Sequence, residues 1–257
     1  MTLDFNNENE IPKIIHYCWF GKNPKPDEVK FCIKSWVEKL PDYQIMEWNE
    51  ENFSVENAVQ YVKDAYAQKK WAFVSDYVRL KALYEYGGIY LDTDVEVFRT
   101  FSDLLHNNFF MGFESRDYVA TAVLASKKNN ELIKAFRDLY INKKFIKQDG
   151  SLDVETTNVV VLTSLLKEYG LELNGKKQVI KGGTIYPQNY FASNNFINIF
   201  GKYKKNIYSY HHCAASWYDV KRKKTKRDLI KHYLVGAARN CIGTDTLIKL
   251  KTILKNK

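Results

Sequence analysis

The order of apolar and polar positions predicts strands that alternate with helices along the chain. Residues 13–20 form a short apolar run rich in β-forming residues, and 27–40 repeats apolar residues at helical spacing. The longest helical stripe covers 72–86, and two glycines end it before a short buried strand at 89–91. The remaining predicted segments are strands at 43–48, 109–113, 118–125, 179–186 and 206–211, and helices at 59–67, 131–140 and 156–169.

This alternation predicts an α/β fold, because strands and helices in this order assemble into a layered sheet. A chain of 257 residues, 45% hydrophobic and 27% charged, is long enough for one large globular domain. We expect residues 1–10 to be a disordered N-terminal tail, residues 11–220 to form the domain, and residues 221–257 to form a basic helical tail.

The sequence predicts no targeting or membrane-spanning segment. Residues 1–10 contain acids and no apolar core like that of a secretory signal. The apolar run 159–162 is far shorter than the roughly 20 residues that cross a bilayer. The four cysteines lack the Cys-x-x-Cys spacing of zinc sites and are expected to be reduced thiols. Together these features predict a cytoplasmic protein.

Positive charge is concentrated at the C-terminus. The net charge is +9, and twelve of the 39 Lys and Arg residues lie within 221–257, beside only two acids. The run KRKKTKR at 221–227, followed by apolar residues, predicts a cationic tail that binds the anionic inner face of a membrane, where each cation contributes about 1 kcal/mol. A solvated run of charge is the alternative. Nucleic acid is not an expected partner, because the charge is confined to the tail.

The sequence Asp92-Thr93-Asp94 directly follows the predicted strand 89–91. Carboxylates two residues apart at the end of a strand face one side, at the edge where open α/β sheets bind ligands. They repel each other unless a cation lies between them, and oxygen ligands suit Mg²⁺ or Mn²⁺. Such an ion would bind a nucleoside diphosphate and offset charge on the leaving group. Alone this pattern is weak, since paired acids also occur near turns by chance.

Asp76 and Arg79 lie three residues apart in the predicted helix 72–86 and therefore share one face. Because the rest of this helix is mostly apolar, we expect the pair to line a polar pocket; a surface ion pair is the alternative. Arginine donates hydrogen bonds and aspartate accepts them, which are the two functions that sugar hydroxyls require.

Three motifs resemble glycosyltransferase family 32, the DXD-containing transferases. They are IPKIIHYCWFG at 11–21, FVSDYVRL and LYEYGGIYLDTDV within 73–95, and HHCAASW at 211–217. The family includes bacterial capsular-polysaccharide transferases and, more distantly, fungal mannosyltransferases and the large clostridial glucosylating toxins. The resemblance implies a GT-A fold over residues 11–220, which is a Rossmann-like nucleotide-diphospho-sugar transferase fold with a mixed central sheet. It also implies a nucleotide-sugar donor, Mn²⁺ or Mg²⁺, and retention of the anomeric configuration.

The resemblance further implies residue roles. Asp76, Arg79 and Asp94 would be catalytic, with Asp94 bound directly to the metal and Asp92 facing the ribose or metal-bound water. Trp19 would stack on the nucleotide base. The residues implied to bind the donor are Tyr17, Cys18, Trp19, Ser75, Asp76, Arg79, Tyr90, Asp92, Ser216 and Trp217.

A third metal ligand is expected from one of two adjacent histidines. His211 or His212 could supply it, because neutral imidazole binds such ions well. We choose His212, so that the predicted metal site is Asp92, Asp94 and His212. His16 lies close to Trp19 in sequence, and it either lines the same cleft or packs in the core.

We therefore expect a metal-dependent hexosyltransferase of surface or capsular polysaccharide synthesis. UDP-sugars are preferred because of Trp19, and GDP-mannose stays open. The acceptor would be a saccharide or lipid-linked glycan, bound by variable loops such as 116–119 and 143–154. No side chain stands out as a covalent nucleophile, which favours front-face attack.

Two alternatives come from other classes. A phosphohydrolase of the haloacid-dehalogenase type also uses the D-x-D-x-[TV] string found at 92–95, although its later acidic pair is missing after Asp94. A non-catalytic, sugar-binding relative of the transferases is the other.

Overall fold

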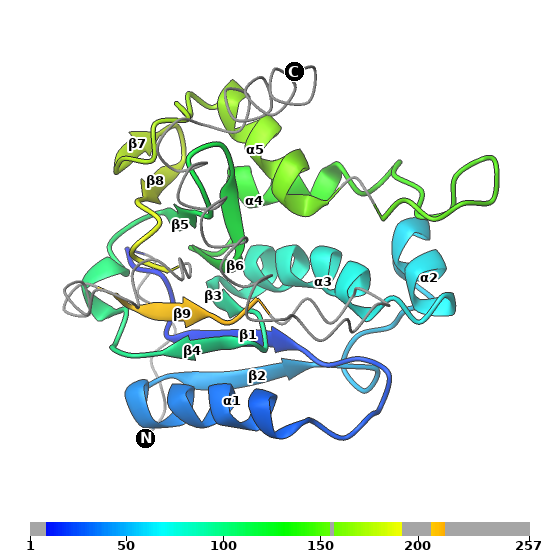
Figure 1. Cartoon of the computed structure of the whole chain (residues 1–257), viewed down its shortest axis with the longest axis horizontal. Coiled ribbons are helices and arrows are strands. Elements are labelled where there is room, and N and C mark those ends of the chain that lie inside the picture. Colours follow the sequence, from blue (N-terminus) through cyan, green and yellow to red (C-terminus); the bar gives the residue numbers. More distant parts are fainter. Residues whose placement is uncertain (1–8, 155–156, 192–206, 214–257) are drawn as a thin grey trace, which may run out of the picture.

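Seven strands form the central sheet of the protein (Figure 1). The computed structural model describes residues 9–154, 157–191 and 207–213. The strands are β1 Ile14–Cys18, β2 Gln44–Trp48, β3 Gly88–Leu91, β5 Phe109–Phe113, β6 Val119–Ser126, β7 Gln178–Ile180 and β8 Gly183–Tyr186. Their order is β2-β1-β3-β6-β5-β8-β7. β1 is parallel to both of its neighbours and β6 is antiparallel to both of its own, so the sheet is mixed, as predicted.

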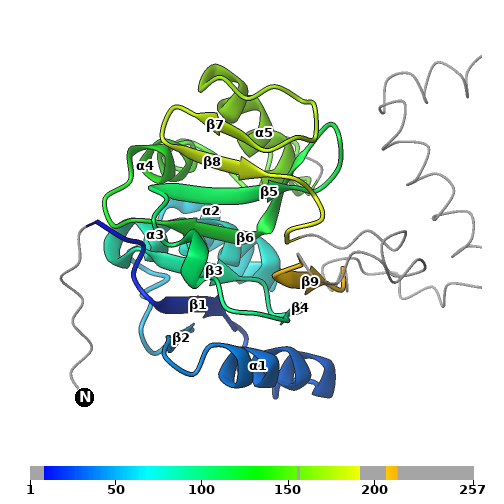
Figure 2. The same cartoon turned by 90° about the vertical axis from the view of Figure 1, so that its left-hand side faces the viewer.

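Helices cover both faces of this sheet. They are α1 Asp27–Lys39, α2 Gln60–Ala67, α3 Trp71–Tyr86, α4 Glu131–Asp138 and α5 Asn158–Glu168, and a 3₁₀ turn spans Ser102–Leu104. Figure 2 shows α2 and α3 behind the central strands. The core on that side is built from α2, α3, α4 and α5, whereas α1 packs with the 3₁₀ turn in the core of the other side. β3 and β6 are buried along their whole length, which explains why their sequences are mostly apolar and do not alternate with exposed polar residues.

A second, two-stranded sheet brings the end of the described chain to its middle. β4 Val95–Val97 pairs antiparallel with β9 Ser209–His211, with Val95 opposite His211. α1 fixes β4 from below, because the Trp36 indole donates a hydrogen bond of 2.7 Å to the Val95 carbonyl. β4 was not predicted, since three residues leave too short a pattern in the sequence.

The other predicted helices and strands agree closely with the structure. The segment 179–186 is the main difference: it is a hairpin of β7 and β8, because Gly182, with φ of +99°, turns the chain between them. Residues 1–8 and 221–257 lie outside the described residues, so the two predicted tails and the domain boundaries stay predictions. No helix among the described residues is both long enough and apolar enough to cross a membrane.

Gly88 allows the start of β3, the strand that leads to the Asp92 turn, to lie close to β1. Its φ is +106°, and an added Cβ would lie 2.6 Å from the Ile14 carbonyl oxygen. We predict that Gly88→Ala lowers the free energy of unfolding by about 3 kcal/mol or more, since a left-handed conformation and a backbone clash add. Gly150→Ala is the matched control, because Gly150 also has a positive φ but has no atom within 4 Å of the added Cβ. Urea denaturation of both variants measures the difference, and equal losses would contradict the role of the clash.

Candidate active site

The Asp92–Asp94 turn joins β3 to β4 and is held by backbone hydrogen bonds on both sides. The Asp92 N–H donates to the Ala122 carbonyl of β6 at 2.9 Å. On the other side, the Asp94 carbonyl accepts a hydrogen bond of 2.9 Å from the N–H of His212, just after β9. Within the turn, the Val95 N–H donates to the Asp92 carbonyl at 3.0 Å. The two carboxylates are therefore positioned by the sheet and not by a free loop.

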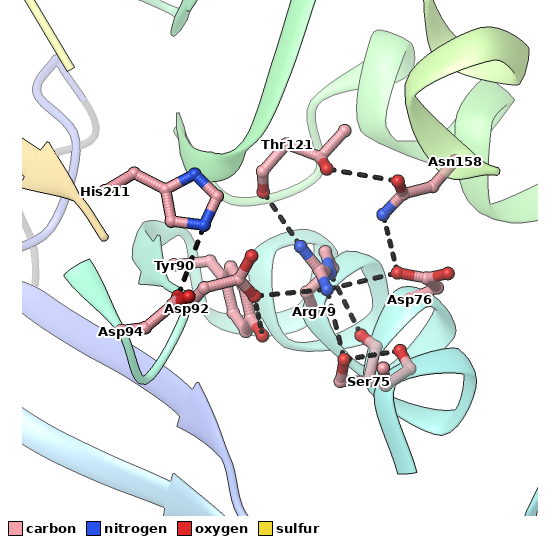
Figure 3. Close-up of polar contacts among 10 residues, drawn as sticks. Ser75, Asp76, Arg79, Tyr90, Asp92, Asp94, Thr121, Asn158 and His211 are labelled. Carbon is pink, nitrogen blue, oxygen red and sulfur yellow. Dashed lines mark hydrogen bonds and ion pairs between the residues drawn. The ribbon is translucent and has the colours of Figure 1, made fainter. Parts of the chain in front are cut away.

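Asp92, Asp94 and His211 form a cluster that could hold a metal ion (Figure 3). One possible ligand atom from each of them lies within 4.8 Å of the other two. Their side chains are 26%, 22% and 20% exposed, so a ligand can reach them from solvent. Two carboxylates and one imidazole are a donor set that fits Mn²⁺ or Mg²⁺.

The structure places His211, and not the predicted His212, beside the acidic pair. His211 pairs with Val95 in the small sheet, and its Nε2 lies 3.3 Å from Asp94 Oδ1. His212 turns the other way, and its Nε2 lies 3.0 Å from Glu96 Oε2. Neighbouring residues at the end of a strand point to opposite sides, so only one ring can join the acidic pair. The pairing of β4 with β9, which the sequence did not reveal, decides that this ring is His211.

The proton on His211 competes with a metal ion. Burial acts to lower the pKa of His211, but its hydrogen bonds to Asp94 and Cys213 raise that pKa well above the ordinary value for histidine. The raised pKa favours the protonated ring, which lies 3.3 Å from Asp94 as its counter-ion. Because a metal ion must displace this proton, its affinity falls as the pH is lowered.

Arg79 lies at the centre of the site and joins α3 to the Asp92 turn (Figure 3). Its Nη2 is 3.1 Å from Asp76 Oδ1 and 3.2 Å from Asp92 Oδ1. The same guanidinium donates to the Thr121 carbonyl at 2.8 Å, and to the carbonyl and hydroxyl of Ser75 at 3.2 and 3.0 Å. A buried cation needs such a complete set of partners. Arg79 is therefore a buried structural cation, and the predicted pair with Asp76 is not a surface ion pair.

Asp76 lies on the side of Arg79 away from the metal cluster. It is buried, and Asn158 at the start of α5 donates to its Oδ1 at 2.5 Å. Burial raises the pKa of Asp76 to about 7, although the neighbouring Arg79 acts to lower it. Asn158 also accepts a hydrogen bond of 3.1 Å from the Thr121 hydroxyl, which fixes the orientation of its amide.

Tyr90 and Cys18 complete the wall behind Asp92. The Tyr90 hydroxyl donates to Asp92 Oδ1 at 2.9 Å, and the guanidinium carbon of Arg79 lies 4.4 Å from the centre of the Tyr90 ring. Cys18 is buried, which raises the pKa of its thiol. These two predicted donor-binding residues thus lie at the site, where they support Asp92 and Arg79.

A cavity of about 450 Å³ opens beyond the carboxyl end of β1. Gly21 and Asn23 line it, and the half-buried Trp19 adjoins it by donating from its indole to the Asn23 carbonyl at 2.7 Å. Trp71 and Tyr66 form an aromatic wall of the cavity, with ring centres 5.1 Å apart. The size suits a nucleoside or small ligand.

One face of α3 runs from this cavity to the metal cluster. Trp71, Ser75 and Arg79 are each four residues apart in the helix and therefore lie in one row. Trp71 is at the cavity, Ser75 one turn further, and Arg79 touches Asp92. The row offers an aromatic ring, a hydroxyl and a cation in that order.

Comparison with known proteins identifies the central part of the chain. Residues 26–111, which contain Asp92 and Asp94, match the family described as the glycosyltransferase sugar-binding region containing a DXD motif. The match spans about a third of the chain and shows similarity to that family in this part. The prediction of a DXD glycosyltransferase is thereby confirmed, and the match favours this class over a phosphohydrolase.

Two curated relatives agree with this assignment. Inositol phosphoceramide mannosyltransferase 3 of Schizosaccharomyces pombe is 32% identical over 138 residues, which are 52% of this chain and 38% of the relative. Inositol phosphoceramide mannosyltransferase 2 of the same yeast is 34% identical over 96 residues, which are 35% of this chain and 27% of the relative. The chain thus spans well under half the length of either relative.

The solved structure supports the fold assignment. PaToxG glycosyltransferase shares 23% identity with a TM-score of 0.51, and the match covers 62% of this chain and 69% of that chain. The predicted GT-A fold is therefore confirmed.

Two of the residues singled out in the sequence have side chains that lie in the core. Tyr17 packs its ring edge-on against Trp36 and donates to Glu47, so its side chain belongs to the core and not to the predicted donor site. His16 is also a core residue: its Nε2 donates to the Gly87 carbonyl at 2.8 Å, and burial lowers its pKa to about 4. Ser216 and Trp217 lie outside the described residues.

Two residues that contact the Asp76–Arg79 pair were not predicted from the sequence. They are Asn158 and Thr121. Asn158 follows two threonines and begins an apolar helix, so its sequence context indicates only a helix start. Thr121 contributes mainly its backbone carbonyl, which leaves no trace in the residue type. Neither residue could be given a role from the sequence, because that role depends on how α5 and β6 pack beside α3.

The raised pKa of Asp76 predicts a pH-dependent stability. In the folded protein Asp76 stays protonated up to about pH 7, whereas an ordinary aspartate ionises near 3.8. The folded state therefore holds a proton that the unfolded state releases, and this group makes stability fall as the pH rises between those values. Asp76→Asn cannot ionise, so its stability relative to wild type should increase from pH 5 to pH 8. Urea denaturation in metal-free buffer measures this, and a relative decrease would show that pairing with Arg79 outweighs burial.

Proposed function

We propose that this protein is a metal-dependent, retaining hexosyltransferase that uses a nucleoside-diphosphate sugar. The observation that supports it most is the cluster of Asp92, Asp94 and His211, with ligand atoms within 4.8 Å of one another, beside the buried Arg79–Asp76 pair. The family match of residues 26–111 supports the transferase class. Mn²⁺ or Mg²⁺ would be the cofactor, held by these two carboxylates and one imidazole.

The donor would lie along the face of α3 that carries Trp71, Ser75 and Arg79. Its base would occupy the cavity beside Trp19, where the ring of Trp71 and the half-buried indole of Trp19 offer stacking surfaces. Its diphosphate would lie at Asp92 and Asp94, and its hexose would extend past Arg79 to Asp76. A nucleobase fits a cavity of about 450 Å³, and we favour UDP-sugars because of Trp19.

The metal ion, Arg79 and Asp76 would each have a different role in the reaction. When bound, the metal ion supplies the positive charge that stabilises the leaving diphosphate. Arg79 keeps Asp92 in place and is itself fully occupied, so it is a positioning group. In Asp76, both donors contact Oδ1, and no donor among the described residues contacts Oδ2. Oδ2 can therefore accept a hydroxyl of the hexose.

Retention of configuration would proceed by front-face attack. The candidate carboxylate nearest the hexose is Asp76, which accepts hydrogen bonds from Arg79 and Asn158. A carboxylate whose charge is held by two donors is a poor nucleophile, and burial further disfavours its ionised form. The acceptor hydroxyl would then attack on the face that the diphosphate leaves, without a glycosyl–enzyme adduct.

The acceptor would be a saccharide or a lipid-linked glycan of surface or capsular polysaccharide synthesis. The two yeast relatives are named for transfer of mannose to inositol phosphoceramide, which is a lipid acceptor. The same names make mannose a candidate hexose beside glucose, galactose and N-acetylglucosamine. The basic segment 221–227 supports a place at the inner membrane face, where lipid-linked acceptors are found.

The metal site can be tested by removing its ligands one at a time. Asp94→Asn and His211→Ala should each lower Mn²⁺-dependent turnover of the preferred nucleotide sugar by about 100-fold, because each removes a group that holds the charge on the leaving diphosphate. His212→Ala is the matched control, since its ring contacts Glu96, and it should keep turnover within about threefold. Rates are measured by release of nucleoside diphosphate from UDP-glucose, UDP-galactose, UDP-N-acetylglucosamine and GDP-mannose.

The same assay separates the remaining alternatives. Cleavage of a simple phosphomonoester without turnover of any nucleotide sugar would support the phosphohydrolase. Tight binding of a nucleotide sugar without turnover would indicate a non-catalytic relative. A greater loss in the His212 variant than in the His211 variant would contradict the assignment of the metal ligand.

The membrane proposal has its own test. The full chain should sediment with vesicles that contain phosphatidylserine at low salt, and about 0.5 M NaCl should release it, because salt screens the charges. A variant with the six basic residues of KRKKTKR changed to glutamine should stay in the supernatant. Sedimentation of both proteins that is equal and insensitive to salt would exclude this role for the tail.

A further inference from the structure

A hairpin between α4 and α5 forms an additional wall beside the candidate site. Phe145 anchors it, because this fully buried ring lies 4.9 Å from the ring centre of Phe73 and 5.5 Å from that of Tyr61. The Asp153 N–H donates to the Phe145 carbonyl at 2.8 Å, and Ile146 pairs with Leu152. The base of the hairpin is therefore fixed against α2 and α3, and the segment extends beside α2 in Figure 1.

The hairpin carries a largely buried ion pair at this base. Lys143 Nζ lies 3.5 Å from Asp153 Oδ2, and the two side chains are only 16% and 11% exposed. The same ammonium lies 5.1 Å from the ring centre of Tyr61 and 5.6 Å from that of Tyr140. Charges this close to full burial need a partner, so this pairing helps to hold the ammonium and the carboxylate in place.

This cluster adjoins Asp76. Lys143 acts on the buried Asp76 carboxylate and lowers its pKa, against the larger effect of burial. The pKa of Tyr61 is raised by burial first and then by the charges of Asp76 and Asp153, and the pKa of Tyr140 responds to the same carboxylates. The packing places the cluster on the same face of α3 as Asp76, because Phe145 contacts Phe73 and the Tyr140 ring centre lies 6.2 Å from that of Tyr77. Phe73 and Tyr77 are the two residues that flank Asp76 on this face.

Two hydroxyls of the cluster have no hydrogen-bond partner among the described residues. They are those of Tyr61 and Tyr140, and both side chains are at least 99% buried. Buried hydroxyls nearly always find a partner, because an unmatched polar group is unfavourable away from water. Two such groups beside a buried ion pair and next to Asp76 indicate a place for the hydroxyls of a ligand.

We propose that Lys143, Asp153 and Tyr61 form the subsite that recognises the hydroxyl groups of the donor hexose farthest from its anomeric carbon. This inference rests on the proposed function, in which the diphosphate lies at Asp92 and the hexose extends past Arg79 to Asp76. An ammonium donates, a carboxylate accepts and a phenol does both, which matches a polyhydroxylated ring.

The charges of the subsite also define the class of sugar. Lys143 is already balanced by the carboxylate of Asp153, so the subsite has no excess positive charge for an acidic sugar. A neutral hexose fits it, whereas a uronic acid would bring a second carboxylate to one ammonium. This assigns the segment 143–154, expected from sequence to bind the acceptor, to the donor sugar.

The test compares binding of the sugar with binding of the bare nucleotide. The full chain with Mn²⁺ is titrated calorimetrically with UDP, GDP, the four neutral nucleotide sugars named above and UDP-glucuronic acid. Wild type should prefer a neutral sugar to the acidic one. Lys143→Met and Asp153→Asn should raise the Kd of the preferred donor about tenfold or more, since each removes a charged hydrogen-bonding group, and leave the Kd of the nucleoside diphosphate within about twofold.

Tyr61→Phe distinguishes recognition from structural support. Its hydroxyl makes no hydrogen bond among the described residues, so the unliganded variant should be as stable as wild type or more stable, yet should bind the preferred donor more weakly. Lys144→Met is the control, because the neighbouring Lys144 is exposed and should leave both Kd values unchanged.

The outcomes separate this inference from the proposed function. If wild type binds no nucleoside diphosphate with Mn²⁺, the proposed function fails and this inference fails with it. If wild type binds the donor and the three variants bind it equally well, or if they lose the donor and the bare nucleotide to the same extent, only this inference is overturned. Preference of wild type for UDP-glucuronic acid would also overturn it.

Discussion

The buried guanidinium of Arg79 is the interaction on which the rest of the site depends. It contacts carboxylates on two separate elements, Asp76 on its own helix and Asp92 on the turn after β3. It also reaches the Thr121 carbonyl of β6, so one side chain joins the helix, the turn and the sheet. Removing one member of such a group would leave a buried charge without its partner. The helix α3 and the Asp92 turn therefore keep their relative positions only as a unit.

The backbone fixes the second half of the site in a different way. The turn that carries Asp94 is tied to β6 and to the residue after β9 by main-chain hydrogen bonds, and α1 holds β4 from the other side. Metal affinity depends on how well ligands are positioned before the ion arrives. A turn held on both sides can place its carboxylates without help from the ion. The distant β9, which brings His211, would therefore be as important to the proposed metal site as the DXD sequence itself.

Much of the fold and about half of the site follow from local sequence patterns, and the remainder depends on long-range pairing. Helix α3, its glycine stop and the Asp92–Asp94 pair are visible because each is encoded by neighbouring residues. The choice of His211 depends on a pairing of β9 with three residues of β4, for which no periodicity exists. Asn158 and Lys143 are hidden for the same reason, since an ordinary polar residue gains its role only when a distant helix or hairpin is placed beside α3. Tyr17 shows the limit of motif positions in another way, because this residue was expected to bind the donor and its ring packs against Trp36 in the core.

In the ligand-free protein, the pKa of one group is raised at each end of the site. At one end His211 holds a proton against Asp94, and at the other burial makes the Asp76 carboxylate hold a proton up to about pH 7. A divalent ion would replace the first proton, and its positive charge, acting through Asp92 and Arg79, would favour the ionised form of Asp76. Metal binding would then favour the ionised carboxylate of Asp76, whose Oδ2 would accept a hydrogen bond from the hexose. Asp92 acts directly on the pKa of Asp76, which it raises, and Arg79 lies in contact with both carboxyl groups, so a change of charge at Asp92 is felt at Asp76.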